Sequence, residues 1–363
     1  MSDSEPLPVE LESTFSAERY FATQPPPHSL EHDMVGVREF IKRQSEDGRN
    51  VVLVTSGGTT VPLELNVVRF LDNFSAGTRG ATSAEYFLKA GYAVIFMHRQ
   101  FSLQPFSRHY SHSTHPFLDF LEIEQVDSGQ PATPSITVKP SERDHLVDVL
   151  TAYKAVHKAG TMHTLTFVTV NDYLWLLRAV SQELSVLGRN ALYYLAAAVS
   201  DFFLPRQRLS EHKIQSGKGS LHIEMDQVPK ILKPMVDEWT RDGFIVSFKL
   251  ETDASLLIPK ARAALARYGH QVVIGNDLHH RKHQVVFISP VSKLNANASG
   301  AADTAQLDGP AAVQSGRAGH EQAYVESWLR IDHVQEPHKE IEEDIVGELV
   351  RRHQVWIEGN VRT

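Results

Sequence analysis

The chain has 363 residues, of which 42% are hydrophobic and 22% charged, a composition typical of a globular protein with a large buried core. Its net charge of -8 argues against broad nucleic-acid binding, and it has no run of about 18 apolar residues that would span a membrane. The lack of cysteine excludes disulfides and thiolate metal sites, and the acidic start lacks the apolar core of a signal peptide, so we expect a cytoplasmic protein.

The N-terminal part of the chain is predicted to hold a flexible segment, a helix and a buried strand, in that order. Residues 1–28 are polar and rich in proline, which indicates a flexible extension. Apolar side chains at helical spacing predict a helix from Ser29 to near Gly48. The consecutive apolar residues 51–54 then indicate a strand buried on both faces, as in a parallel sheet.

Strands and helices alternate along the rest of the chain. A glycine-rich turn and a helix that ends at Gly91 follow the first strand. Such alternation predicts an α/β fold whose mainly parallel sheet is covered by helices on both faces. We predict further strands at residues 93–97, 164–170, 191–199, 221–225, 244–248, 271–275 and 285–289, and further helices at 172–184, 229–239, 254–269 and 339–353.

Two segments break this alternation. Residues 100–145 are polar and rich in histidine, serine and proline. Residues 290–325 are small and polar, and they cannot bury enough apolar surface to offset the entropy that is lost on ordering. We therefore predict a single domain over residues 29–363 that contains a disordered insertion at 290–325.

Two glycine-rich turns give the first indication of a binding site. Gly57 follows the first buried strand, where paired glycines let backbone N–H groups approach a phosphate, although a tight turn without a ligand has the same pattern. Gly77 and Gly80 come just before a helix, whose free N–H groups and dipole favour an anion. Asn73 beside them is either a donor to that anion or an ordinary turn residue.

Residues after the later strands add to this site. The three alanines 196–198 let a ligand lie against the backbone, and Asp201 follows either in the same crevice or as a helix N-cap. Lys213 is on a glycine-flanked polar loop, which is either a mobile flap over phosphates or a solvated surface loop. Phe248 is expected to stack on a base or to pack in the core, and Asn276 to hydrogen-bond a base or ribose.

Two groups of histidines have spacings that metal sites also use. One runs from His109 to His115 and the other from His279 to His283. Serine lies between the members of the first group, proline follows them, and no helix is predicted there. We interpret both groups as solvated loop residues and predict no metal site.

Five blocks of this sequence closely resemble phosphopantothenoylcysteine synthetase of the stand-alone eukaryotic kind. They include both glycine-rich turns, the alanine run and the lysine loop. The bacterial form of this family carries a flavin-dependent decarboxylase in front, and the residues before Val51 are too few to hold that domain, so decarboxylation is not expected. The blocks are residues 54–85, 194–205, 212–217, 246–253 and 273–277.

The resemblance implies a Rossmann-like three-layer domain that forms a homodimer, with a small flap that contributes to the neighbouring active site. It also implies roles for particular residues of the site. Gly57, Ser75, Gly77 and Gly80 line the nucleotide phosphates; Phe248 and Asn276 lie at the base and ribose; Asn73, Ala197, Ala198 and Asp201 surround the pantothenate arm; and Asn73, Lys213 and Arg69 are catalytic.

The reaction that the resemblance implies belongs to coenzyme A synthesis. The carboxylate of 4′-phosphopantothenate attacks the α-phosphate of a nucleoside triphosphate, and pyrophosphate leaves. The amine of L-cysteine then displaces the nucleoside monophosphate from the acyl-nucleotidylate. ATP is the expected nucleotide, with CTP as the alternative, and Mg²⁺ is expected to neutralise phosphate charge together with Lys213 and Arg69.

Two other functions stay open on the sequence alone. A nicotinamide-dependent oxidoreductase would need a GxGxxG fingerprint, which is missing, and an acidic residue after the second strand, where this chain has Arg99. Arg99 disfavours NAD but would suit NADP. The other alternative is a catalytically silent binding subunit of a metabolic complex.

Overall fold

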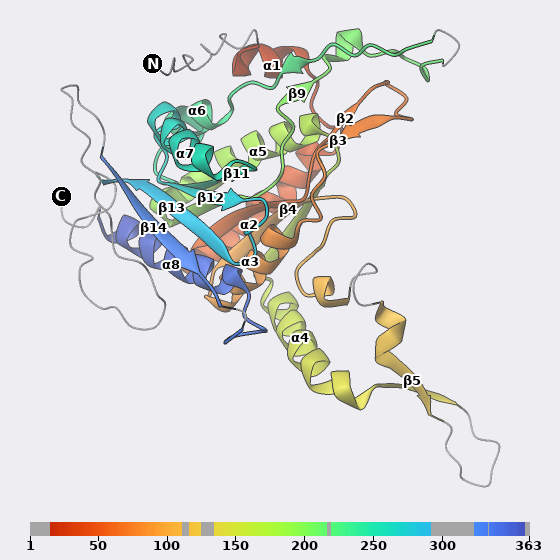
Figure 1. The fold of residues 1–363 in the computed structure, drawn as a ribbon, viewed down its shortest axis with the longest axis vertical. Helices are drawn as coiled ribbons and strands as arrows, with labels where there is room; N and C mark the ends of the chain where they lie inside the picture. Colours follow the sequence, from red (N-terminus) through yellow and green to blue (C-terminus); the bar gives the residue numbers. More distant parts are fainter. Residues whose placement is uncertain are drawn as a thin grey trace, which may run out of the picture.

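A central sheet of eight strands runs through the protein (Figure 1). The strands from β7 to β12 along the sheet are parallel, while β13 pairs antiparallel with both β12 and β14. The computed structural model describes residues 15–110, 116–124, 134–215, 219–291, 323–332 and 334–359. In spatial order the strands are β14 (Tyr324–Arg330), β13 (Gln284–Pro290), β12 (Val272–Asp277), β11 (Phe244–Glu251), β8 (Ala191–Leu195), β1 (Val51–Ser56), β4 (Ala93–Arg99) and β7 (Met162–Phe167).

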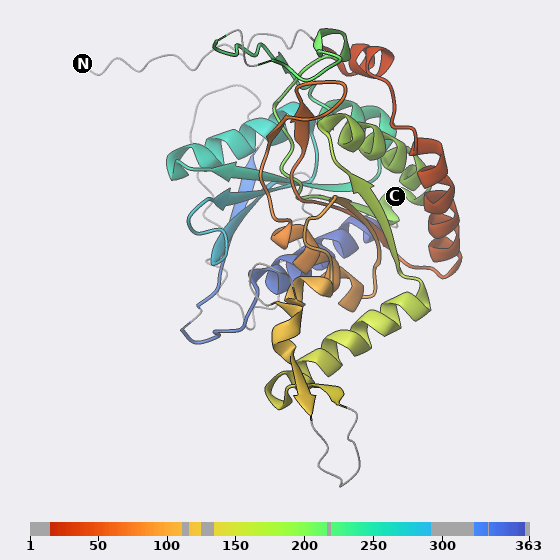
Figure 2. The same ribbon diagram turned by 90° about the vertical axis from the view of Figure 1, so that its right-hand side faces the viewer.

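Helices cover both faces of this sheet (Figures 1 and 2). Successive strand residues point to opposite faces, so Leu53 of β1 packs with α2 and α5, whereas Val52 and Val54 pack with α3 and α8. The three-layer α/β fold predicted from the sequence is therefore confirmed. The helices are α1 (Ala17–Thr23), α2 (Leu30–Glu46), α3 (Thr78–Lys89), α4 (Pro140–Ala159), α5 (Val170–Leu184), α6 (Leu232–Pro234), α7 (Ala254–Tyr268) and α8 (Ile341–Glu358).

The strand order reverses direction at β1. The chain passes from β1 to β4 and β7 on one side, and then returns to β8 on the other side of β1. The connections that follow β1 and β8 therefore diverge, which leaves a crevice beyond the C-terminal ends of the two strands. The sheet thus brings the glycine turn after β1 next to the alanine run after β8, where Gly58 and Ala198 form an isolated parallel bridge.

The first described residues belong to the folded body. Ser16 caps α1, and Tyr20 is fully buried with its hydroxyl donating to the Asn171 side chain at 3.0 Å. The prediction of a flexible segment over residues 1–28 is wrong for its second half, because one short aromatic helix packs there despite the surrounding prolines. Residues 1–14 lie outside the described residues.

An arm projects from the layered body between β4 and β7 (Figures 1 and 2). It contains a hairpin of β5 (Leu121–Glu124) and β6 (Ser135–Val138), followed by helix α4. No residue of α4 is buried. This helix was not predicted from the sequence, because a helix that packs on little else lacks the broad apolar stripe on which such a prediction depends.

Two elements before β11 differ from the prediction. Residues 221–225 form no strand, and the neighbouring β10 (Asp226–Gln227) instead pairs with β9 (Phe202–Phe203) of the same chain. The helix predicted at residues 229–239 is divided into the short α6 and a π-helical turn, Met235–Trp239. Pro234 at the junction has no N–H to donate, so the α-helical hydrogen bonding is interrupted there.

The C-terminal part also contains a strand that was not predicted. Pro290 ends β13 and Tyr324 begins β14, so both ends of the predicted insertion belong to the sheet. The central part of the predicted insertion, residues 292–322, lies outside the described residues. Among the helices of the described chain, none combines the length and the apolar character that crossing a bilayer requires.

Candidate active site

The turns after β1 and β8 are locked together by hydrogen bonds. The Ala198 N–H donates to the Gly57 carbonyl at 2.8 Å, and the Thr59 N–H donates to the Ala198 carbonyl at 3.0 Å. The Ala197 N–H donates to the Thr55 hydroxyl at 3.1 Å. Both alanine N–H groups are therefore used inside the protein, and a ligand that lies here meets the small methyl side chains.

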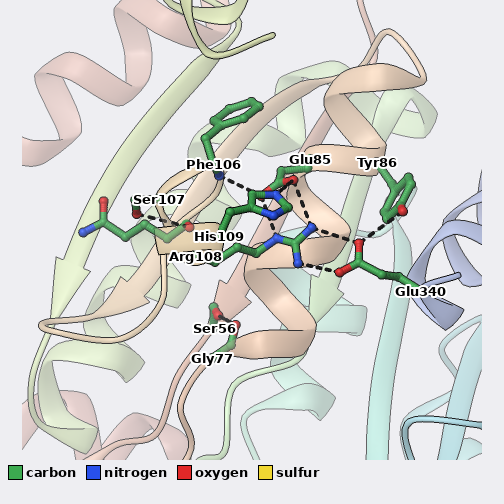
Figure 3. A network of polar contacts seen from close by, with 10 residues as sticks. Ser56, Gly77, Glu85, Tyr86, Phe106, Ser107, Arg108, His109 and Glu340 are labelled. Carbon is green, nitrogen blue, oxygen red and sulfur yellow. Dashed lines mark hydrogen bonds and ion pairs between the residues drawn. The ribbon is translucent and has the colours of Figure 1, made fainter. Parts of the chain in front are cut away.

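The turn before α3 has the geometry of an anion site (Figure 3). Gly77 adopts a left-handed conformation with φ of 84°, and its carbonyl accepts from the Ser56 hydroxyl at 3.0 Å. The Gly77 N–H donates to the Ser75 hydroxyl at 3.3 Å, and Gly80 follows in the first turn of the helix. The first N–H groups of a helix have no partner within it, and the dipole favours negative charge there, so this turn suits a phosphate.

Phe248 and Asn276 lie on neighbouring strands and face the same side of the sheet as α3. Phe248 is half-buried and packs edge-on against Tyr194, with 4.9 Å between the ring centroids. Phe248 is paired with Ile274, so Asn276 is two residues closer to the open edge of the sheet. Asn276 is 5% exposed, and its amide oxygen accepts from Arg79 at 3.2 Å. An aromatic ring and an amide at this edge can hold a base and a ribose.

Asn73 and Asp201 lie on turns at the same edge, with exposed side chains. The backbone N–H of Asn73 donates to the turn after β1 at 3.0 Å. Asp201 and Ala197 line a cavity of about 260 Å³ whose wall is formed by residues of α5, β8 and β11. Lys230 and Lys249 also line this cavity, which therefore combines an apolar wall with two positive charges and the Asp201 carboxylate.

The segment that carries Lys213 is anchored by a partly buried ion pair. Arg69 donates to the Glu64 carboxylate at 2.9 Å and to the Ile214 carbonyl at 2.9 Å. The Glu64 side chain is fully buried; burial opposes its ionisation, but the N–H groups of Arg69 and Ile214 and the Arg69 charge hold its pKa below the usual value. Arg69 thus fastens the lysine segment to the loop between β2 (Thr60–Pro62) and β3 (Phe70–Asp72), while Lys213 itself is exposed.

One histidine of each group contacts a single carboxylate. His109 contacts Glu85 at 3.2 Å (Figure 3), and His280 contacts Asp277 at 2.8 Å. The other members of the first group, His112 and His115, lie outside the described residues. Within the described ranges, no three histidine or acidic side chains come together as a group that could hold a metal ion.

The chain is similar to known proteins along most of its length. Residues 143–299 match the family of the DNA/pantothenate metabolism flavoprotein C-terminal domain. Phosphopantothenate–cysteine ligase CAB2 of Saccharomyces cerevisiae is 42% identical over 366 residues, which cover 95% of this chain and 87% of the relative. The chain belongs to the phosphopantothenate–cysteine ligase family. The family predicted from the sequence is therefore confirmed, and the oxidoreductase alternative gains no support.

A further ligase and a solved structure agree with this assignment. The phosphopantothenate–cysteine ligase of Homo sapiens is 46% identical over 257 residues, which cover 70% of this chain and 80% of the human protein. The structure of a Cab2 mutant in complex with phosphopantothenate-cysteine matches with a TM-score of 0.77 at 42% identity, over 94% of this chain and 99% of that chain. The structural match extends the family likeness to nearly the whole fold.

Several residues of the candidate site were not singled out from the sequence. Arg79 contacts Asn276, Ser56 holds the Gly77 turn, and Glu64 anchors Arg69. Arg79 could have been found from the sequence, because it lies between the two glycines of the predicted anion turn.

Proposed function

We propose that this ligase joins 4′-phosphopantothenate to L-cysteine, with ATP as the nucleotide that activates the carboxylate. The observation that carries the proposal is a shared edge of the sheet. The anion turn before α3 is held by Ser56 at the end of β1, and the cavity lined by Ala197 and Asp201 lies at the ends of β8, which neighbours β1, and of β11. A triphosphate on the turn and a pantothenate arm in the cavity would bring phosphate and carboxylate together there.

The first step forms the acyl-nucleotidylate. A carboxylate oxygen of 4′-phosphopantothenate attacks the α-phosphorus, the bond from that phosphorus to the bridging oxygen breaks, and pyrophosphate leaves. Two anions meet in this step, so the main task of the site is to neutralise charge as it builds on the phosphates. The N–H groups of the Gly77 turn and the Lys213 ammonium would supply that positive charge, and the Asn73 amide would donate to the acyl-phosphate.

The second step forms the amide bond. The amine nitrogen of cysteine attacks the acyl carbon, and the bond from that carbon to the phosphate oxygen breaks. The nucleoside monophosphate leaves with the electron pair of that bond, and the amine nitrogen loses its proton to water. Neither step needs a covalent bond to the protein.

The remaining residues are assigned by their places at this edge. The Arg69 guanidinium is already paired with Glu64 and also donates to the Ile214 carbonyl. Arg69 would therefore act by anchoring the lysine segment. We assign Gly57, Ser75, Gly77 and Gly80 to the phosphates, Phe248 and Asn276 to the base and ribose, and Asn73, Ala197, Ala198 and Asp201 to the pantothenate arm.

Mg²⁺ would enter this site together with the nucleotide. It usually keeps several waters and binds through substrate phosphates and one or two carboxylates. The exposed Asp201 carboxylate is available at the crevice, and the described residues contain no group of three ligands that would cage the ion without a nucleotide. When bound, the ion would supply further positive charge to the phosphates.

We further propose that the active form is a homodimer that associates around β2, β3 and β9. Large apolar side chains are exposed in this region, among them Val67 at 53%, Phe70 at 49% and Phe202 at 51%. These elements lie at the same end of the molecule (Figure 1), next to the anchored lysine segment. Clustered exposed apolar residues are typical of an interface, and a two-fold axis here would bring the lysine segment of one subunit towards the site of the other.

A coupled pyrophosphate-release assay tests the proposed reaction. With 4′-phosphopantothenate and ATP, sustained release accompanied by AMP is expected only when L-cysteine is present, and without cysteine the release should stop after a single turnover. Substituting CTP for ATP decides the nucleotide. An absence of release with all three substrates, or release that does not depend on phosphopantothenate, would contradict the proposal.

A further inference from the structure

Arg79 stands where three elements meet at the nucleotide end of the site. Its guanidinium donates to the Glu342 carboxylate at 2.8 Å, to the Asn276 amide oxygen at 3.2 Å and to the Arg281 carbonyl at 2.5 Å. These partners belong to the first turn of α8, the end of β12 and the turn that follows it. The Arg79 and Glu342 side chains are only 16% and 12% exposed, so the contacts are largely shielded from water.

The helix itself gives no reason for an arginine at this position. The first turn of a helix favours acidic side chains, and the charge of Arg79 opposes the dipole of α3. A long side chain that is fixed at several points also loses its rotamer freedom. The presence of an arginine at residue 79 must therefore be explained by its contacts with residues outside α3.

The contact with Asn276 determines which side of the amide a ligand can use. A side-chain amide has an acceptor oxygen and an NH₂ donor group, and it rotates to suit its partners. Arg79 occupies the oxygen, and the amide nitrogen lies 3.5 Å from the Ile274 carbonyl. The amide is thereby held with its nitrogen as the group left for a ligand, so a nucleotide that reaches Asn276 meets a donor.

A second bridge keeps the helix of Glu342 in place (Figure 3). Glu340, at the N-cap of α8, accepts from Arg108 at 2.5 and 2.9 Å, and Arg108 also donates to Glu85 of α3 at 2.7 Å. Burial raises the pKa of Glu342, and the charge of Arg79 opposes that rise. The start of α8 is thus fastened to α3, and the carboxylate of Glu342 is held where it fixes Arg79.

We propose that Arg79 is a positioning residue of the nucleotide site, which acts by holding the Asn276 amide in its donor orientation. Glu342 in turn holds Arg79. The inference rests on the proposed function, in which Asn276 contacts the base or ribose. Loss of Arg79 therefore raises KM for ATP, while KM for phosphopantothenate and for cysteine stays unchanged.

A double-mutant cycle tests this relationship. Arg79→Met and Asn276→Ala are each expected to raise KM for ATP by up to about tenfold, as for the loss of one neutral hydrogen bond to the nucleotide. The combined variant should match Asn276→Ala, because Arg79 acts through that residue. Glu342→Gln keeps the shape of the side chain and is expected to give a smaller rise. The control Arg351→Met removes an ion pair with Glu348 on the same helix and should leave KM unchanged.

The outcomes distinguish a failure of the inference from a failure of the proposed function. Effects of Arg79→Met and Asn276→Ala that multiply in the combined variant would overturn the inference, and so would a normal KM for ATP in Arg79→Met. If Asn276→Ala alone has no effect while the ligase works, both the assignment of Asn276 and the inference fail. If Arg79→Met does not fold, as thermal unfolding would reveal, the cycle of Glu342→Gln with Asn276→Ala is decisive, and multiplying effects there again overturn the inference.

Discussion

Gly80 of α3 lies directly against Ser56 at the end of β1. A Cβ atom at residue 80 would come within 2.5 Å of the Ser56 Cβ and 2.4 Å of its hydroxyl oxygen. The same hydroxyl donates to the Gly77 carbonyl, so this close approach sets the position of the anion turn relative to the sheet. Packing therefore gives a reason for glycine at residue 80 that does not depend on a ligand.

Gly80→Ala is expected to destabilise the fold and to weaken nucleotide binding. The added methyl group overlaps Ser56 and must push α3 away from β1, which typically costs about 1–3 kcal/mol in the free energy of unfolding. Chemical denaturation and KM for ATP measure the two effects. Gly347→Ala on α8 is the matched control, because a Cβ there meets nothing within 4 Å and alanine favours the helix. Equal stabilities of the two variants would contradict the prediction.

Lys213→Ala is expected to reduce turnover by about 10²–10³, as is typical for removing one group that stabilises charge in a transition state. The side chain is exposed in this structure, so its main contribution should come when the segment meets the phosphates. Steady-state kinetics should therefore give a large fall in kcat with little change in KM for ATP. Lys233→Ala, which removes a surface ion pair with Asp237, should leave both unchanged. Near-normal turnover in Lys213→Ala would show that Lys213 does not contribute to catalysis.

Asn73→Asp should abolish most activity without unfolding the protein. The backbone N–H of Asn73, which ties the turn to Thr59, is kept in the variant, and the side chain is exposed. A carboxylate there would stand against the α-phosphate, whereas the smaller loss expected for Asn73→Ala reflects only the missing donor. Turnover by both variants and their thermal unfolding are the measurements. Normal turnover of both variants would show that Asn73 is only a turn residue and takes no part in catalysis.

The layered fold was predictable because its central strands are buried on both faces. All six residues of β1 are buried, and such strands appear in a sequence as continuous apolar runs. The elements that were missed have a different environment. Helix α4 buries no residue, and β14 at the edge of the sheet has only one buried residue, Leu329, so neither has a strong apolar pattern.

The glycine turns of the candidate site were predictable for a related reason. A positive φ at Gly77 and a close backbone contact at Gly80 each require glycine, whatever lies elsewhere in the chain. The ion pairs around the site gave no comparable signal. Arg79 and Glu342 are separated by 263 positions, and only the tertiary fold brings them together.

The buried His353 is expected to make stability depend on pH. Its Nδ1 accepts from the Tyr92 hydroxyl at 2.7 Å and its Nε2 donates to the Arg189 carbonyl at 2.8 Å, and burial lowers its pKa to about 4. The unfolded state, with a histidine pKa of about 6.5, binds more protons between these values, so stability is lost as the pH falls through this window, by at most about 3 kcal/mol.

His353→Gln should remove this part of the pH dependence. Glutamine keeps a neutral donor and acceptor but does not titrate, so the loss of unfolding free energy between pH 7.5 and pH 4.5 should be smaller than in the wild type. Chemical denaturation at the two pH values measures it, with the exposed His32→Gln as control. Identical pH dependence in the wild type and His353→Gln would refute the prediction.

The homodimer predicts an activity that depends on protein concentration. Sedimentation should give twice the mass of the chain at micromolar concentration, and specific activity should fall on dilution below the dissociation constant. Val67→Lys places an unpaired charge among the exposed apolar residues around β2 and β3, and it should raise that constant at least about tenfold, since burying such a charge is costly. Val186→Lys changes an equally apolar side chain, 76% exposed on the turn after α5, and should have no effect. If the wild type sediments as a monomer at full activity, both the dimer and the shared site are refuted, because no second subunit is then present to complete the pocket.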